Sequence, residues 1–99
     1  MIVVRNVFRL KYGQARPALA LLSEGRSLMK RIDPKASSRL LTDVVGPSYT
    51  FVLENTYETL GAFELSAPGV MGSSEWRAWY QKFVPLVESG YREIFTIVD

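Results

Sequence analysis

The sequence of 99 residues contains neither cysteine nor histidine. Without cysteine the chain has no disulfides, thiolate metal sites or thiol nucleophiles, and without histidine it lacks the side chain that most often transfers protons near neutral pH. The commonest haem ligands are missing for the same reason. Glycine-rich phosphate loops and acidic clusters with metal-ligand spacing are absent too. We therefore expect no metal site and no cofactor.

Charge of one sign and long apolar runs are also scarce. The 12 Lys and Arg, set against 10 Asp and Glu, leave a net charge of +2, and the basic residues are scattered along the chain. This balance argues against a nucleic-acid or membrane partner. No apolar run approaches the ~20 residues of a membrane span or the pattern of a signal peptide. We expect a cytoplasmic protein whose residues 1–99 form one domain.

Aromatic residues, in contrast, gather in residues 73–99. Six residues of this stretch recur at helical spacing and would share one face: Trp76, Trp79, Tyr80, Phe83, Val84 and Val87. The pattern predicts a helix over residues 75–89, kinked at Pro85 and ended by Gly90, and then a strand over residues 91–98. Such a face either packs in the core or walls a pocket for a flat organic molecule.

The remaining residues predict one more helix and three more strands. Apolar residues at helical spacing indicate a helix over residues 15–32, in which Gly25 is explained by close approach to the sheet. Alternating patterns predict three strands: residues 2–11, 39–45 and 49–57. The last two strands should pair as a hairpin. Residues 59–65 are compatible with a short helical turn, and residues 66–74 have loop composition.

The order β-α-β-β-α-β predicts an α+β, ferredoxin-like fold with a four-stranded antiparallel sheet and both helices on one face. We expect the first and third strands to be central neighbours and to run parallel. The sheet face away from the helices is half apolar, which in a small domain indicates an interface. We therefore expect an obligate homodimer with six candidate interface residues: Val3, Arg5, Val7, Arg9, Val52 and Glu54. Arg5 and Arg9 would need acidic or carbonyl partners there, such as Glu54 or Asp43.

Asn6 and Asn55 interrupt the apolar, helix-facing sides of their strands. An unpaired buried amide costs about 1–3 kcal/mol, so each must bond the backbone, another side chain or a ligand. A planar, partly polar ligand requires an aromatic wall with a few polar groups. If the chain binds a small molecule, we expect it between the sheet and the aromatic helix, near seven candidate residues: Asn6, Tyr49, Asn55, Trp76, Trp79, Tyr80 and Arg92.

Three stretches, residues 3–13, 49–64 and 76–97, resemble the dimeric α/β-barrel superfamily, and most of all its small antibiotic-biosynthesis-monooxygenase-like and NIPSNAP-like members. The resemblance implies homodimers with back-to-back sheets. In some members it also implies a cleft between helices and sheet that binds aromatic polyketides, haem or other small molecules. Members that degrade haem rely on a histidine, which this chain lacks. Cofactor-free members use Asn, Trp, Tyr and Arg residues, but no motif assigns them to positions here.

Function therefore stays open between two main alternatives. One is a dimer that binds an aromatic or hydrophobic molecule and oxidises it without a cofactor. That reaction needs an electron-rich substrate and a polar group for its anion, supplied by an Asn, Tyr80 or Arg92. The other is a non-catalytic dimerisation or scaffold protein. An RNA-recognition module shares the strand order but is disfavoured, because Val3 and Glu54 stand where that module needs aromatic residues.

Overall fold

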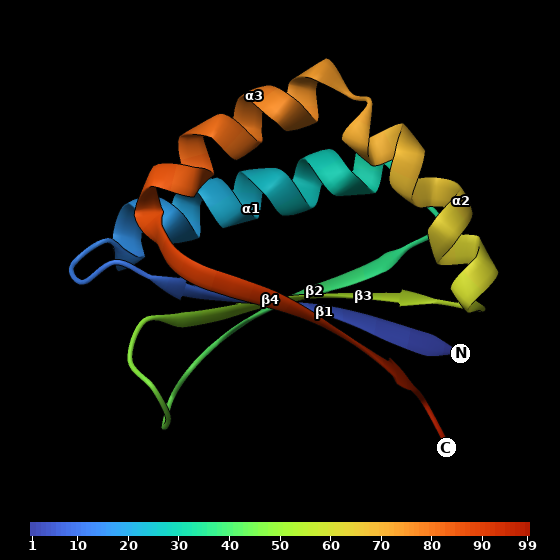
Figure 1. The fold of residues 1–99 in the computed structure, drawn as a ribbon, viewed down its shortest axis with the longest axis horizontal. Coiled ribbons are helices and arrows are strands. Elements are labelled where there is room, and N and C mark those ends of the chain that lie inside the picture. Colours follow the sequence, from blue (N-terminus) through green and yellow to red (C-terminus); the bar gives the residue numbers. More distant parts are fainter.

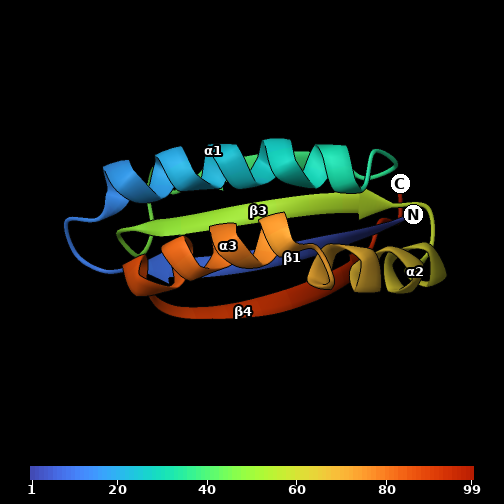
Figure 2. The ribbon, with the colours of Figure 1, turned by 90° about the horizontal axis from the view of Figure 1, so that it is seen from above.

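The computed structural model describes residues 1–99 and places three helices on one face of a four-stranded sheet (Figure 1). The elements, in chain order, are β1 (Ile2–Leu10), α1 (Ala15–Ile32), β2 (Ser37–Thr42), β3 (Thr50–Tyr57), α2 (Leu60–Met71), α3 (Ser74–Phe83), the 3₁₀ turn η1 (Val84–Leu86) and β4 (Val87–Thr96). Seen from above (Figure 2), α1 and α3 lie side by side, and α2 continues past the end of β3. The predicted α+β, ferredoxin-like fold is confirmed, with one additional helix.

The sheet has the order β2-β3-β1-β4, and every neighbouring pair is antiparallel. The prediction that the first and third strands run parallel is therefore wrong. The connections give the reason. The crossover through α1 makes β2 parallel to β1, and the hairpin then makes β3 run opposite to β2, hence opposite to β1.

The predicted helix over residues 75–89 is wrong at its C-terminal end, because α3 stops at Phe83. Pro85 has no backbone N–H and ends the α-helix, so the chain makes the short turn η1 instead. The last strand then begins at Val87, four residues earlier than predicted. Gly90 is not a helix end but lies within β4, where a Cβ would come within 3.0 Å of the Phe8 ring.

Residues 60–71 form the helix α2, although the sequence predicts only a short turn and then a loop there. Thr59 caps this helix by accepting a hydrogen bond from the Ala62 N–H at 3.0 Å. Pro68 lies inside the helix, and Val70 is its only buried residue. No helix of the structure has both the length and the apolarity needed to cross a membrane.

The second strand is also displaced, running from Ser37 to Thr42 instead of over residues 39–45. Asp43 ends it, because its carboxylate accepts a hydrogen bond from the Thr50 N–H at 3.0 Å. Val44 and Val45 therefore lie in the hairpin turn, where they are almost fully exposed.

Two hydrophobic clusters lie between the helices and the sheet. The larger lies under α1 and α3 and consists of Leu10, Ala18, Leu22, Leu28, Phe51, Trp79 and Phe83. The smaller consists of Val4, Ala36 and Tyr57, with Ala62 and Phe63 of α2 packed against it. Gly25 faces the larger cluster, where a Cβ would lie 2.5 Å from two ring atoms of Trp79. The prediction that Gly25 approaches the sheet is thus wrong, because the close approach is made by Trp79 of α3.

Candidate functional site

Four polar side chains occupy two adjacent rows on the helix-facing side of the sheet. In the first row, the Ser38 hydroxyl donates a hydrogen bond to Asn55 Oδ1 at 2.6 Å. In the second row, Arg92 Nε donates to Asn6 Oδ1 at 2.9 Å. Both asparagines thus find a side-chain partner on the neighbouring strand. Each uses only its oxygen, so the two Nδ2 groups remain as donors without a partner in the chain.

Arg92 lies at the edge strand β4, where α2 comes down onto the sheet. Its Cζ atom is 5.5 Å from the centre of the Phe63 ring, a cation–π contact. Guanidinium has five N–H donors, and only one of them is used by Asn6. Arg92 is exposed. It therefore offers a fixed positive charge, with donors to spare, at the rim of the layer between α2 and the sheet.

Two further polar residues, which the sequence analysis did not single out, are buried nearby. Asp33 is 7% exposed and Tyr57 6% exposed. The Asp33 Oδ2 atom has no hydrogen-bond partner in the chain. Burial raises the pKa of the Tyr57 phenol above its ordinary value of 10.0; the Asp33 carboxylate adds to this rise, and Ser66 and Arg92 oppose it. We call Asn6, Asn55, Arg92, Asp33 and Tyr57 the α2 polar cluster.

The raised pKa predicts a pH effect on stability. Below about pH 10 Tyr57 is protonated in both folded and unfolded chains, so it contributes no pH dependence. As the pH rises further, the unfolded chain releases this proton first, and the folded state loses relative stability up to its own, higher pKa. Tyr57→Phe should remove that part of the alkaline loss in urea unfolding series. Tyr12→Phe is the control, because Tyr12 is 88% exposed; equal alkaline slopes in both variants would contradict the assignment.

The predicted aromatic candidates lie elsewhere. Trp76 and Trp79 stack on each other with ring centres 4.7 Å apart, and the buried Trp79 indole N–H donates to the Leu21 carbonyl oxygen on α1. Tyr80 is 48% exposed. Tyr49 has a positive φ of 64° in the turn just before β3 and lies beside Tyr12, with ring centres 5.2 Å apart.

The seven predicted ligand residues therefore do not meet in one place. Asn6, Asn55 and Arg92 come together near α2, whereas Trp76 and Trp79 pack between α1 and α3. The space beneath α3 is filled by side chains of the larger hydrophobic cluster. The polar candidates and the two tryptophans thus lie in two separate parts of the molecule.

The opposite face of the sheet carries a row of charges that crosses all four strands. Strand register sets Arg39, Glu54, Arg5 and Glu93 directly beside one another, one residue from each strand. Arg39 donates to Glu54 Oε1 at 2.6 Å, Arg5 Nε lies 3.0 Å from Glu54 Oε2, and Arg5 lies 3.6 Å from Glu93 Oε2. We call these four residues the charge row. The predicted ion pair between Arg5 and Glu54 is confirmed.

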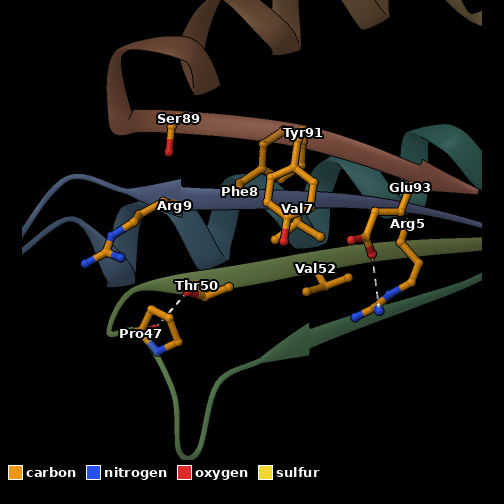
Figure 3. A pocket seen from close by; sticks show the side chains of 10 residues that line it. All are labelled: Arg5, Val7, Phe8, Arg9, Pro47, Thr50, Val52, Ser89, Tyr91 and Glu93. Atoms are coloured by element: carbon orange, nitrogen blue, oxygen red, sulfur yellow. Dashed lines mark hydrogen bonds and ion pairs between the residues drawn. The ribbon is translucent and has the colours of Figure 1, made fainter.

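Next to the charge row lies an apolar row with the same strand order: Leu41, Val52, Val7 and Tyr91. Figure 3 shows Val52, Val7 and Tyr91 in line across their strands, where they border a shallow depression of about 380 Å³. All six predicted interface residues lie on this face. Arg9 is exposed at its rim and has no acidic partner, because Asp43 bonds the backbone of Thr50 instead.

Comparisons with known proteins rest on structure alone, because no family model and no curated protein matches this sequence. A NIPSNAP domain protein from Burkholderia xenovorans is 17% identical, with a TM-score of 0.87 over 99% of this chain and 95% of that chain. An antibiotic-biosynthesis-monooxygenase-like protein from Nitrosomonas europaea is 15% identical, with a TM-score of 0.78 over the full length of both. SnoaB, a cofactor-independent oxygenase from Streptomyces nogalater, is 13% identical, with a TM-score of 0.75 over 99% of this chain and 93% of that chain. The chain thus has the ferredoxin-like fold shared by NIPSNAP and antibiotic-biosynthesis-monooxygenase-like proteins.

Proposed function

We propose that this chain forms a homodimer and that each copy binds a small aromatic or hydrophobic molecule between α2 and the sheet. One observation carries the ligand proposal. The α2 polar cluster contains one buried atom without a partner, Asp33 Oδ2, and beside it donors of Asn6 and Arg92, half-buried and exposed, that no other part of the chain uses. Buried polar groups are normally paired, and an unpaired one costs about 1–3 kcal/mol. A ligand that donates a hydrogen bond to Asp33 Oδ2 removes this cost.

The groups of the cluster define the chemistry of the ligand. Arg92 and the asparagine Nδ2 groups donate hydrogen bonds, so they suit a carbonyl, carboxylate or ionised hydroxyl. Asp33 Oδ2 accepts, so it suits a hydroxyl. The rings of Tyr57 and Phe63, whose centres are 5.4 Å apart, offer an aromatic wall. A planar ring system that carries an ionisable hydroxyl or carboxyl group fits this set.

The helix α2 is the element that yields when such a ligand enters. Of its twelve residues only Val70 is buried, whereas α1 and α3 bury their central apolar residues in the larger cluster. Pro68 removes one backbone hydrogen bond inside α2, and Gly61 and Gly69 each lower helix propensity by about 1 kcal/mol relative to alanine. Displacing α2 therefore costs less than displacing either of the other helices.

Oxidation is the reaction to test, since SnoaB shares the fold and is a cofactor-independent oxygenase. A ligand that ionises to an enolate or phenolate is electron-rich, and Arg92 is placed to stabilise the anion. Anthrone is a suitable probe because it ionises to a planar enolate. Its reaction with one dioxygen molecule gives anthraquinone and water, and is followed by oxygen uptake. Absence of enzyme-dependent uptake leaves a binding protein.

Ligand binding is tested with 9-anthracenecarboxylate, a planar aromatic anion, by titration of its fluorescence. We expect Arg92→Ala to weaken binding about tenfold, the effect of losing one charge-assisted hydrogen bond of roughly 1.5 kcal/mol. Asn6→Leu should also weaken it and leave the unfolding transition in place. Arg77→Ala on the exposed side of α3 is the matched control for charge. Equal affinities of the Arg92 and Arg77 variants would place the ligand elsewhere.

A non-catalytic dimerisation protein is the second candidate. The filled space beneath α3, where Trp79 and Phe83 pack against Leu22, favours it. Under this alternative the wild-type protein forms dimers in light scattering but binds neither 9-anthracenecarboxylate nor anthrone. The homodimer itself is supported by the apolar row, which leaves Tyr91 60% and Leu41 37% exposed in a single copy.

A further inference from the structure

We propose that the charge row recognises a second copy of this chain and sets its orientation, so that the two sheets pack face to face about a two-fold axis parallel to the central strands. The inference deepens the homodimer proposed above and rests on it. Its basis is the order of the charges, which follows from the strand register of this chain.

Across the sheet the charge row alternates in sign, from Arg39 on β2 through Glu54 on β3 and Arg5 on β1 to Glu93 on β4. Glu54, near the middle, is 9% exposed and is held by the arginines on both sides. The outer residues Arg39 and Glu93 are more open, with 71% and 35% of their side chains exposed. Each has one ion-pair partner within its own copy, Glu54 for Arg39 and Arg5 for Glu93, and stays open on its outer side to a charge from a second copy.

When a row of four alternating charges is turned end for end and laid against the original row, every charge meets one of opposite sign. A two-fold axis parallel to the strands reverses the strand order, so Arg39 faces the partner's Glu93 and Glu54 faces the partner's Arg5. A perpendicular axis that passes through the row instead sets each residue opposite its own copy, arginine on arginine and glutamate on glutamate. Like charges in contact repel each other, so the row disfavours this second arrangement.

The neighbouring apolar row is compatible with the same axis. Reversal places Leu41 opposite the partner's Tyr91 and Val52 opposite the partner's Val7, so that apolar side chains meet apolar side chains. Packed sheets keep their strand directions within about 30° of each other, which preserves this matching close to the axis. Buried ion pairs add little net affinity, because desolvation offsets their attraction. We therefore assign affinity to the apolar row and orientation to the charge row.

Charge reversal at the outer positions tests the proposal. R39E and E93R each place like charges together at both ends of the row, so each variant should dimerise at least about tenfold more weakly than wild type. An equimolar mixture of the two should form heterodimers, seen by native mass spectrometry, because opposite charges then meet at both ends. The double variant R39E/E93R should recover homodimers. R31E, which breaks the ion pair with Glu75 between the helices, is the control and should dimerise like wild type.

Rescue in the mixture separates the proposal from an effect within one chain. R39E also loses its bond to Glu54, but a second polypeptide restores dimers only if position 39 faces position 93 across the interface. A cross-linking experiment gives an independent reading. With a short bismaleimide, L41C mixed with Y91C should give cross-linked dimers, and neither variant alone should; the absence of native cysteine removes background. Cross-linking of L41C alone would overturn the orientation.

The failure of this inference and that of the homodimer are distinguishable. A wild-type protein that is monomeric at micromolar concentration in light scattering would overturn both. Wild-type dimers accompanied by R39E and E93R dimers of equal strength, with random mixing, would overturn the role of the charge row and leave the homodimer standing.

Discussion

Replacing Trp79 with alanine should lower the free energy of unfolding by about 3–5 kcal/mol, as for other large buried aromatic residues. Trp79 is 4% exposed, stacks against Trp76 and Phe83 with ring centres 4.7 and 5.1 Å away, and bonds the Leu21 carbonyl oxygen on α1. Its removal opens a cavity between α1 and α3 and leaves neighbouring rings without contacts. Small domains have about 5–15 kcal/mol in total, so urea denaturation should show a large loss.

Tyr80→Ala is the matched control, since Tyr80 follows Trp79 in α3 but is 48% exposed. Surface changes of this kind usually stay within about 0.5 kcal/mol. Trp79→Phe should recover part of the loss because it keeps an aromatic ring in the cluster. If the alanine variants at positions 79 and 80 unfold at the same urea concentration, the core does not depend on Trp79.

Gly25→Ala is the second large effect, and its direction is opposite to that expected from helix propensity. Alanine favours a helix interior by about 1 kcal/mol over glycine. Here, however, the added Cβ would lie 2.5 Å from the Cε2 and Cζ2 atoms of Trp79, and that ring is held between Trp76 and Phe83. Overpacking a core typically costs about 1–3 kcal/mol, so we expect net destabilisation in urea unfolding.

Gly69→Ala supplies the contrast, because Gly69 is also helical but a Cβ there meets nothing within 4 Å. It should stabilise the protein, by up to about 1 kcal/mol. Combining Gly25→Ala with Trp79→Ala should cost less than the sum of the single changes, because the new methyl group enters vacated space. Stabilisation by alanine at both glycines would show that α1 and α3 are not packed closely at Gly25.

The fold could be predicted from the sequence where one pattern covers one element. The apolar stripe of residues 15–32 gives both ends of α1. The aromatic stripe misleads at its end, because Val84 and Val87 continue the helical spacing even though Pro85 stops α3. Val84 is 47% exposed in the turn and Val87 begins the edge strand, so these two matches to the helical spacing do not belong to a buried helix face. A proline inside a helical pattern is therefore stronger evidence that the helix ends than two further apolar matches are that it continues.

The candidate site could be predicted only in part. Asn6 and Asn55 stand out as polar residues on apolar strand faces, and both take part in the α2 polar cluster. Their partners, Ser38 and Arg92, depend on strand register, which alternation alone does not determine. The sequence does not identify Asp33 as a site residue either, because an Asp-Pro pair directly after a helical pattern is already explained as the end of that helix.

The predicted ligand residues lie in separate places because the sequence does not predict the helix α2. Residues 66–74 have the composition of a loop, so the sequence predicts that the aromatic helix itself lies over Asn6 and Asn55. Instead Thr59 starts a helix that continues through Pro68 and covers the end of the sheet near Tyr57. Two helices, α2 and α3, thus cover the area that the sequence assigns to one, and Trp76, Trp79 and Phe83 lie with α3, away from the α2 polar cluster.

The order of signs in the charge row also affects whether related proteins in one cell form mixed dimers. Under the proposed pairing, a relative whose row begins with glutamate on β2 and ends with arginine on β4 would still match its own reverse. Placed against this chain, however, it would set every charge against one of the same sign. Two gene duplicates of opposite phase would therefore assemble only with themselves, and intermediates with a single reversed charge would assemble poorly with either.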